Sequence, residues 1–222
     1  MYTDTFSHVQ KDSGMEGMVA RWYAATTGKS RDDFTDLARR IAREVAPNGS
    51  VLEIAPGPGY FAIELAKRGA YAITGLDLSH TFVDIARTKA AEEGVGVDFR
   101  QGNASDMPCA DNSFDFFLCR AAFKNFARPV RALHEMYRVL KPGGRGLIID
   151  LRRDVSQHEI DRHVEGIGTN AINKLMINLV FRTVLLKRAY TKEQFRQMLS
   201  RVDFREVDIR QENIGFDIWL TK

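Results

Sequence analysis

The sequence predicts an α/β fold in which helices cover both faces of one doubly wound, mostly parallel sheet. Three observations support this prediction. Apolar runs of strand character alternate with segments whose apolar residues recur at helical spacing. One such run leads through a turn with two glycines into a helix, and the next run ends on a carboxylate. Two apolar runs joined by a short polar turn close the chain, and they must pair antiparallel. We therefore expect seven strands, with the last one reversed.

The expected elements follow one another at short intervals. Ser30 is predicted to cap a helix whose apolar face runs from Phe34 to Val45, and Thr191 to cap a helix over 192–201. Lys141 to Gly144 is a stop signal for the helix before it. A helix over 79–93 is expected to end at Gly94. The predicted strands cover residues 50–55, 71–77, 97–101, 114–119, 145–151, 204–210 and 214–220.

The glycine turn fits two classes of adenine cofactor. With Gly57, Gly59 and a later Asp77, it passes as a dinucleotide fingerprint. A pyrophosphate, however, is stabilised by backbone N–H groups and repelled by a nearby anion. Glu53 stands beside this turn and would attract the ammonium and sulfonium groups of S-adenosylmethionine, by about 4 kcal/mol at 4 Å and a dielectric of 20. The sign favours the cationic cofactor, while a Glu53 tied only to backbone groups remains the alternative.

Four blocks of sequence resemble class I S-adenosylmethionine-dependent methyltransferases, in the broad group that includes ubiquinone/menaquinone-biosynthesis-type enzymes. The resemblance runs from about Asp36 to the C-terminus. Each block is a weak signal, but their order and spacing are specific. The resemblance implies a Rossmann-like sheet of seven strands with the last strand antiparallel. The blocks are Val51–Tyr60, Gly75–Ser79, Gly102–Pro108, and Ser113–Asp115 followed by Arg138–Gly144.

The resemblance also implies which residues bind S-adenosylmethionine. The acidic residue Glu53 and the turn would hold the methionine part, and Asp77 would accept bonds from the ribose hydroxyls. Two positions depart from the family pattern, since Ala55 replaces a usual glycine and Asn103 a commoner aspartate. The full set of expected cofactor residues is Glu53, Ala55, Pro56, Gly57, Gly59, Asp77, Leu78, Asn103, Ala104, Cys119, Arg120 and Tyr23.

By the same resemblance the chain divides into a helical N-terminal arm or cap, 1–46, and a methyltransferase domain, 47–222. In the arm, Phe6, Trp22 and Tyr23 would cover the site, although ordinary packing roles are equally open. A helical insert over 152–190 would form a lid. Its apolar segment 171–186 must be covered by something. Packing on its own domain is favoured over a dimer interface and over an interfacial membrane helix.

The expected reaction is methyl transfer to a small, apolar or aromatic acceptor, catalysed mainly by alignment and exclusion of water. We identify no catalytic residue. Trp22, Phe123, Lys124 and His158 are candidate substrate contacts, but Lys124 reads first as a solvated loop lysine and His158 as a solvated helix position. No metal is expected, because Asp150 and Asp154 lack an evident third ligand.

Composition and charge limit the classes of partner and the cellular compartment that we expect. The 222 residues are 44% hydrophobic with a net charge of +3 and no basic block, so a nucleic-acid partner is not expected. Two cysteines favour a reducing compartment, and we expect a cytoplasmic protein without a transmembrane segment. Peripheral membrane contact and a monomeric or homodimeric state stay open. The alternative functions are a nicotinamide-dependent oxidoreductase and a non-catalytic nucleotide-binding domain.

Overall fold

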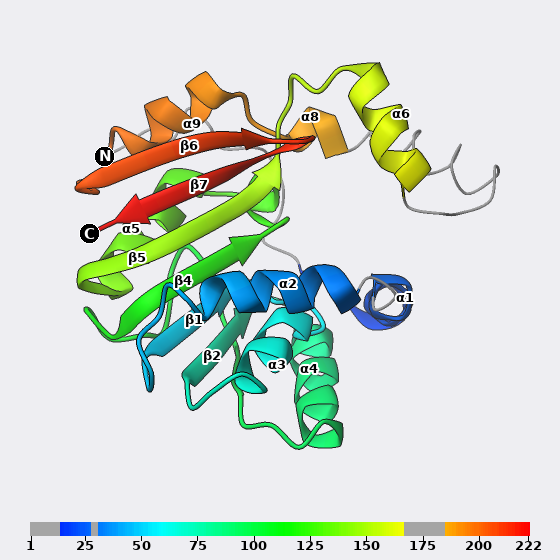
Figure 1. Ribbon diagram of the computed structural model, residues 1–222, viewed down its shortest axis with the longest axis vertical. Coiled ribbons are helices and arrows are strands. Elements are labelled where there is room, and N and C mark those ends of the chain that lie inside the picture. Colours follow the sequence, from blue (N-terminus) through cyan, green and yellow to red (C-terminus); the bar gives the residue numbers. More distant parts are fainter. Residues whose placement is uncertain (1–13, 28–30, 167–184) are drawn as a thin grey trace.

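The computed structural model describes residues 14–27, 31–166 and 185–222 and confirms the predicted sheet (Figure 1). Its seven strands lie in the order β3-β2-β1-β4-β5-β7-β6. The strands β1 to β5 pair in parallel, whereas β7 runs antiparallel to both of its neighbours, β5 and β6. The strands are β1 (Ser50–Ile54), β2 (Ala72–Asp77), β3 (Asp98–Gln101), β4 (Phe114–Arg120), β5 (Leu140–Leu151), β6 (Glu206–Glu212) and β7 (Gly215–Thr221).

Helices cover both faces of this sheet. One apolar cluster joins the sheet to α2, α3 and α4, and another joins it to α5 and α9. The helices α1, α6 and α8 lie toward the edge to which the arrows of β4 and β5 point (Figure 1). The described helices are α1 (Gly17–Thr27), α2 (Arg31–Ile41), α3 (Tyr60–Ala66), α4 (His80–Glu92), the 3-10 turn η1 (Phe123–Asn125), α5 (Pro129–Val139), α6 (Gln157–Gly166), α8 (Leu186–Arg188) and α9 (Lys192–Leu199).

The alternation of side chains along β1 determines the face of the sheet toward which Glu53 points. Successive residues of a strand point to opposite faces. Leu52 and Ile54 therefore join the cluster with α5 and α9, whereas Val51 joins the cluster with α2, α3 and α4. Burying each of these side chains contributes roughly 1.5–3 kcal/mol and fixes the register. Glu53 follows Val51 by two residues, so its carboxylate is directed toward α3.

Some predicted boundaries were wrong by a few residues. The helix expected to reach Val45 ends at Ile41, and turns follow it. The stop signal ends α5 at Val139 as predicted, but Lys141 to Gly144 already lies in β5, because Leu140 pairs with Phe114 on β4. The α9 cap is confirmed, since Thr191 forms a capping box with Gln194.

Other predictions fall outside the described residues. These are the role of Phe6, the Ser30 cap and nearly all of the 171–186 helix. The first part of the insert is helical as expected, and α6 packs Ile160 and Val164 against the preceding Val155 in a small apolar cluster. Within the described ranges, no helix is both long and apolar enough to cross a membrane. The division into an arm and a main domain stays a prediction.

Candidate functional site

The expected cofactor residues meet at the carboxyl ends of β1, β2 and β4. The turn after β1 is held to β2 by a bond from the Ala55 N–H to the Leu76 carbonyl (2.8 Å). Arg120 ends β4, the other neighbour of β1. The side chains or exposed backbone of Ala55, Gly57, Leu78, Asn103, Ala104 and Arg120 are all half-buried. A band of partly accessible groups therefore surrounds two buried carboxylates.

Asp77 connects the two halves of this site. Its Oδ2 accepts the Gly57 N–H (2.8 Å) in the turn, and its Oδ1 accepts the Ser79 N–H (2.9 Å) at the start of α4. The residue is 7% exposed. Burial raises the pKa of this carboxyl, and the two N–H donors oppose that shift. The carboxylate is thus fixed where the resemblance places the ribose.

Glu53 is buried more deeply, at 4% exposure. Its Oε2 accepts the Ala62 N–H in α3 (3.1 Å), so the backbone tie considered from sequence is present. Burial raises the pKa of Glu53 to about 8, although the Ala62 N–H and the charge of Arg120 act in the opposite direction. Near neutral pH this carboxyl therefore keeps its proton. A bound cation would favour its ionised form.

The two glycines of the turn have different reasons to be glycine. Gly59 (φ +77°) lies against α4 and β3, since a Cβ there would come within 2.6 Å of the Phe99 ring. Gly57 (φ +55°) faces open space, with no atom within 4 Å of a Cβ. Ala55 adopts the left-handed region with φ +56°, which costs an L-residue about 1–2 kcal/mol. The alanine that replaces the usual glycine is therefore accommodated with backbone strain.

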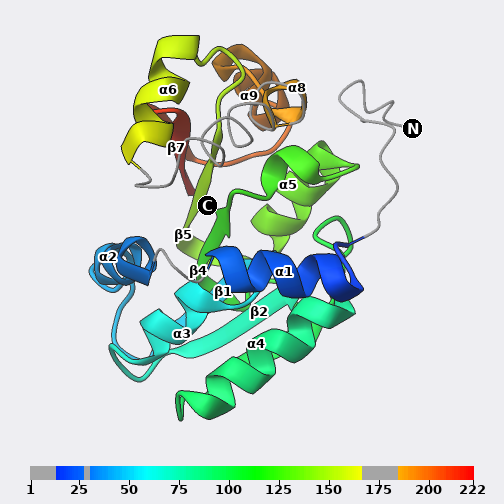
Figure 2. The ribbon, with the colours of Figure 1, turned by 90° about the vertical axis from the view of Figure 1, so that its right-hand side faces the viewer.

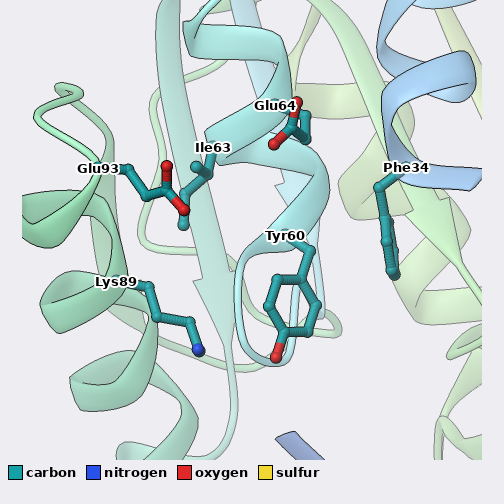
Figure 3. Close-up of a pocket in the computed structure, with 6 residues that line it drawn as sticks. All are labelled: Phe34, Tyr60, Ile63, Glu64, Lys89 and Glu93. Carbon is teal, nitrogen blue, oxygen red and sulfur yellow. The ribbon is translucent and has the colours of Figure 1, made fainter. Parts of the chain in front are cut away.

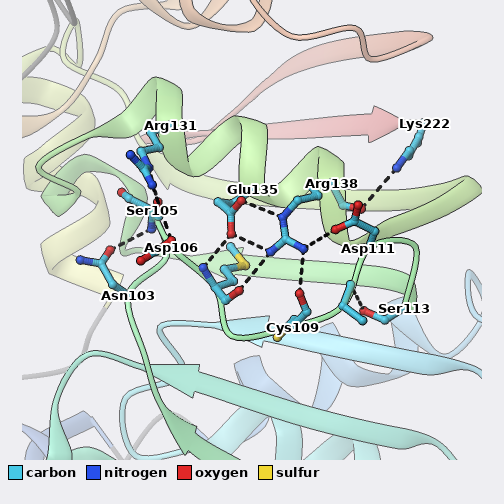
Figure 4. A network of polar contacts seen from close by, with 12 residues as sticks. Asn103, Ser105, Asp106, Cys109, Asp111, Ser113, Arg131, Glu135, Arg138 and Lys222 are labelled. Atoms are coloured by element: carbon cyan, nitrogen blue, oxygen red, sulfur yellow. Dashed lines mark hydrogen bonds and ion pairs between the residues drawn. The ribbon is translucent and has the colours of Figure 1, made fainter.

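The loop after β3, which carries Asn103 and Ala104, is fastened to α5 (Figure 4). Arg138 donates to the Met107 and Cys109 carbonyls, and Glu135 accepts the Met107 N–H (2.7 Å). Asn103 Oδ1 accepts the Ser105 N–H (2.8 Å), and the NH₂ of the same side chain can donate to a ligand. Sequence reasoning missed this clamp. The i,i+3 spacing of Glu135 and Arg138 was the available signal.

Two of the residues predicted at the end of β4 and in the loop after it are more buried than an open site requires. Cys119 is fully buried in the core, so its thiol cannot line an open site. The guanidinium of Arg120 lies 4.6 Å from the centre of the Phe34 ring on α2. Phe123 is also fully buried, and its ring packs against that of Phe195. The ring is therefore not accessible to a substrate in this structure, contrary to its predicted role as a substrate contact.

Lys124 was wrongly read as a solvated loop lysine. Its side chain is 6% exposed, and its Nζ lies 2.9 Å from Asp150 Oδ1. Asp150 Oδ2 also accepts the Lys124 backbone N–H (2.8 Å), and the ammonium donates to the Ala121 carbonyl. Lys124 therefore ties the loop to β5 through two bonds to Asp150 and braces the loop itself through a third bond. A sequence alone does not reveal that a polar residue in a short loop points inward.

The arm and the lid helix contribute less than expected. Tyr23 packs edge-on against Phe82 of α4, with ring centres 5.9 Å apart. Trp22 is 67% exposed. His158 is exposed on α6, as predicted, and contacts Arg162 (2.8 Å). Of the four candidate substrate contacts, Phe123 and Lys124 are buried, whereas Trp22 and His158 are exposed.

Two depressions of the surface lie away from these carboxylates. A crevice between α2, α3 and α4 is lined by Phe34, Tyr60 and Lys89, and its ≈ 10 Å³ of enclosed space holds at most one water (Figure 3). A shallow groove lies between α9 and β6, at the sheet edge farthest from β3. Neither is lined by Glu53, Asp77 or any other of the expected cofactor residues.

The two acidic residues once considered as metal ligands have other partners. Asp150 pairs with Lys124, and Asp154 with Arg152 (3.3 Å). Across the described part of the chain, no three His, Cys, Asp or Glu side chains are grouped to hold a metal ion.

Residues 52–148 match a family model described as a methyltransferase domain. The demethylmenaquinone methyltransferase of Deinococcus radiodurans is 42% identical over 101 residues, which are 45% of this chain and 42% of that protein. The ubiquinone/menaquinone biosynthesis C-methyltransferase UbiE of Geotalea daltonii is 38% identical over 109 residues, 47% of this chain and 46% of the relative. The matched part is thus about half the length of these curated relatives.

Solved structures share the whole fold. A Methanococcus maripaludis protein assigned as an S-adenosyl-L-methionine-dependent methyltransferase superposes with a TM-score of 0.72 at 21% identity, covering 97% of both chains. The 4+2 cyclase SpnF superposes with a TM-score of 0.62 at 24% identity, covering 81% of this chain and 61% of the cyclase. The same fold therefore carries more than one chemistry, and the site must decide the function.

Proposed function

Because this chain carries a class I S-adenosylmethionine-dependent methyltransferase domain, we propose that it methylates a small aromatic acceptor of the quinone type. The observation that carries the proposal is the pair of buried carboxylates, Glu53 and Asp77, at the carboxyl edge of the sheet. A buried carboxylate without a lysine or arginine bonded to it favours a cationic ligand. The quinone-type acceptor is supported by the names of the relatives that match at 38–42% identity.

In this proposal, a residue of this site is assigned to each part of the cofactor. The Glu53 carboxylate would bind the ammonium group, and the neighbouring Arg120 guanidinium the carboxylate, of the methionine part. Asp77 would accept bonds from the ribose hydroxyls. Leu78, Asn103 and Ala104 would contact the adenine. When bound, S-adenosylmethionine supplies an electrophilic methyl group on a sulfonium.

The contribution of the chain to the reaction is orientation and exclusion of water. The loop over 120–126 borders the expected methyl position, and the Lys124–Asp150 pair fixes that loop to β5. An acceptor with an ionised aromatic hydroxyl carries its own electron density to the methyl carbon. Positioning alone then lowers the barrier, since effective molarities in such arrangements reach about 10⁵–10⁸ M.

The decisive experiment measures product rather than binding. Purified protein is incubated with S-adenosylmethionine and a panel of demethylated quinones, quinols and unrelated aromatic phenols. We expect S-adenosylhomocysteine together with an acceptor heavier by one CH₂, formed best from a quinone-type compound. Calorimetry with S-adenosylmethionine and NAD is run in parallel.

Two outcomes would contradict the proposal. Tight binding of NAD without binding of S-adenosylmethionine would favour a nicotinamide-dependent oxidoreductase. Binding of S-adenosylmethionine without turnover of any acceptor would favour a non-catalytic nucleotide-binding domain.

A further inference from the structure

Helix α1 lies across the carboxyl edge of the sheet, over the ends of β1 and β2 (Figure 2). It is fastened at both ends to the helices that follow those strands. We name the contacts at its start the N-terminal anchor, formed by Met15 to Gly17 with Ser79 to Thr81. The contact at its other end, between Ala24 and Tyr60, is the C-terminal anchor.

The N-terminal anchor is centred on Glu16. Its carboxylate accepts the backbone N–H groups of His80 (2.9 Å) and Thr81 (3.1 Å) and the Thr81 hydroxyl. In return, the Gly17 N–H donates to Thr81 Oγ1 (3.0 Å), and the Ser79 hydroxyl donates to the Met15 carbonyl (2.6 Å). The chain just before is equally close, because a Cβ at Gly14 would lie 2.8 Å from the Ser79 nitrogen.

The C-terminal anchor is simpler. The Tyr60 hydroxyl donates to the Ala24 carbonyl (2.6 Å), and the bond is buried. Tyr60 directly follows Gly59 of the cofactor turn and begins α3. Each anchor is therefore adjacent to one of the predicted cofactor elements: the turn after β1, or Asp77 at the end of β2.

Glu16 is more than a helix cap for α4. Ser79 already fills that role, since its Oγ accepts the Phe82 N–H (3.0 Å). Glu16 lies close enough to Asp77 for its charge to add to the rise in the pKa of that carboxyl, of which burial is the main cause. A second carboxylate beside the ribose position is costly unless it serves to hold the arm.

We propose that Glu16 is a positioning residue for the cofactor site, which holds the segment 14–17 and α1 as the outer wall of the ribose end. This inference rests on the proposed function. With the N-terminal anchor formed, the cofactor is enclosed between α1 and the strand ends. Without it, α1 remains attached through the Tyr60–Ala24 bond and the Tyr23–Phe82 ring contact, and the cofactor is lost more readily.

The test uses the full chain and four variants. Glu16→Gln removes the charge, and Thr81→Val removes the hydroxyl with little change in shape. Thr81→Ser keeps the hydroxyl and serves as the conservative rescue. Asp84→Asn is the matched control, because Asp84 is an exposed acid on α4 whose carboxylate lies 3.1 Å from His80 Nδ1.

Two measurements are made on each protein. The rate of tryptic cleavage after Arg21, an exposed residue of α1, reports whether the arm is docked. Calorimetry and stopped-flow dissociation report the affinity and release rate of S-adenosylhomocysteine. We expect Glu16→Gln and Thr81→Val to speed cleavage and to weaken binding, each by about five- to tenfold, with faster release. Thr81→Ser and Asp84→Asn should resemble the wild type.

Several results would overturn the inference. Faster cleavage with unchanged affinity would show that the arm is held but takes no part in the cofactor site. Unchanged cleavage would show that Glu16 does not hold the arm. If the wild type itself fails to bind S-adenosylhomocysteine, the proposed function fails along with this inference. That outcome differs from failure of the inference alone, in which wild type and Glu16→Gln bind equally well. Thermal unfolding of each variant identifies any that do not fold.

Discussion

The two halves of the sheet treat buried carboxylates in opposite ways. On the β1–β2 side, Glu53 and Asp77 are bonded to backbone N–H groups, and the nearest cation, Arg120, acts on Glu53 only through its field. On the β4–β5 side, Asp150 is bonded to the ammonium of Lys124 as well as to two backbone N–H groups. Glu53, Asp77 and Asp150 are all buried, so burial does not explain why only Asp150 is bonded to a cation.

The difference supports the proposal that the β1–β2 half of the sheet binds the charged cofactor. Burial of a carboxylate without a bonded cation is unfavourable, and a cationic ligand can relieve it. A carboxylate already neutralised by a lysine offers no such gain. On the cofactor side, Glu53 therefore stays protonated until a cationic ligand favours its ionised form, whereas the Asp150 carboxylate that holds the loop after β4 is already paired with Lys124. This arrangement suits a cationic cofactor and an acceptor recognised by shape.

The largest expected effect is on the side that is already neutralised. Lys124→Met leaves Asp150 buried without its cation, and we expect a loss of about 3–5 kcal/mol in the free energy of unfolding. Urea denaturation followed by circular dichroism measures it. The double variant Lys124→Met with Asp150→Asn should recover most of that loss. A change below about 1 kcal/mol in the single variant would show that the pair is not essential to the fold.

On the cofactor side, removing the charge of Glu53 should raise the free energy of unfolding, whereas Lys124→Met lowers it. The pKa of Glu53 is raised from 4.5 to about 8 on folding, so between these pH values the folded state holds a proton that the unfolded state has lost. Stability therefore falls as pH rises through this window, by at most about 5 kcal/mol. Glu53→Gln should be more stable than wild type at pH 9 and equal to it at pH 4. Equal stability at both pH values would show that Glu53 is not desolvated.

The same group should make cofactor affinity depend on pH. Binding of an ammonium requires the Glu53 carboxylate, so below pH 8 the ligand must displace a proton. We expect the affinity for S-adenosylhomocysteine to rise by up to about tenfold per pH unit between pH 6.5 and 8 and then to level off. Calorimetry in buffers of different ionisation enthalpy should detect proton release near pH 7. Glu53→Gln should bind weakly and show no such slope.

Substitution of Asp77 should have a smaller effect, and it tests where the ribose of the cofactor binds. Asp77→Ala removes both acceptors for the ribose and frees the Gly57 and Ser79 N–H groups. We expect the affinity for S-adenosylhomocysteine to fall by more than about tenfold. Asp115→Ala is the control, because Asp115 is bonded to Ser50 and Lys141 near the start of β4. Unchanged binding by Asp77→Ala would place the ribose elsewhere.

The sequence revealed the cofactor side better than the acceptor side for a physical reason. A strand, a glycine turn and a carboxylate after the next strand are local patterns, and the parallel sheet brings their ends together. Lys124 and Asp150 are 26 residues apart, and only the packing of η1 against β5 shows that they pair. The bond between Glu16 and α4 spans 64 residues and was not foreseen either. Periodicity shows which face is apolar, but not which polar side chain turns inward.

Backbone strain gives the smallest effect and tests whether the two halves differ in charge alone. Ala55 after β1 and Ala121 after β4 both adopt positive φ, at 56° and 57°. Ala121→Gly and Ala55→Gly should each stabilise the fold by up to about 1 kcal/mol, because the relieved strain exceeds the added entropy of the unfolded chain. Ala122→Gly, at an ordinary φ of −122°, should destabilise it instead.

Thermal unfolding compares the three variants. If strain is stored equally on both sides, the first two variants gain equally, and the asymmetry between the halves lies in their carboxylates. A gain at Ala55 alone would mean that the β4 loop is held in its strained form by the Lys124 contact to the Ala121 carbonyl, and that this contact compensates the strain.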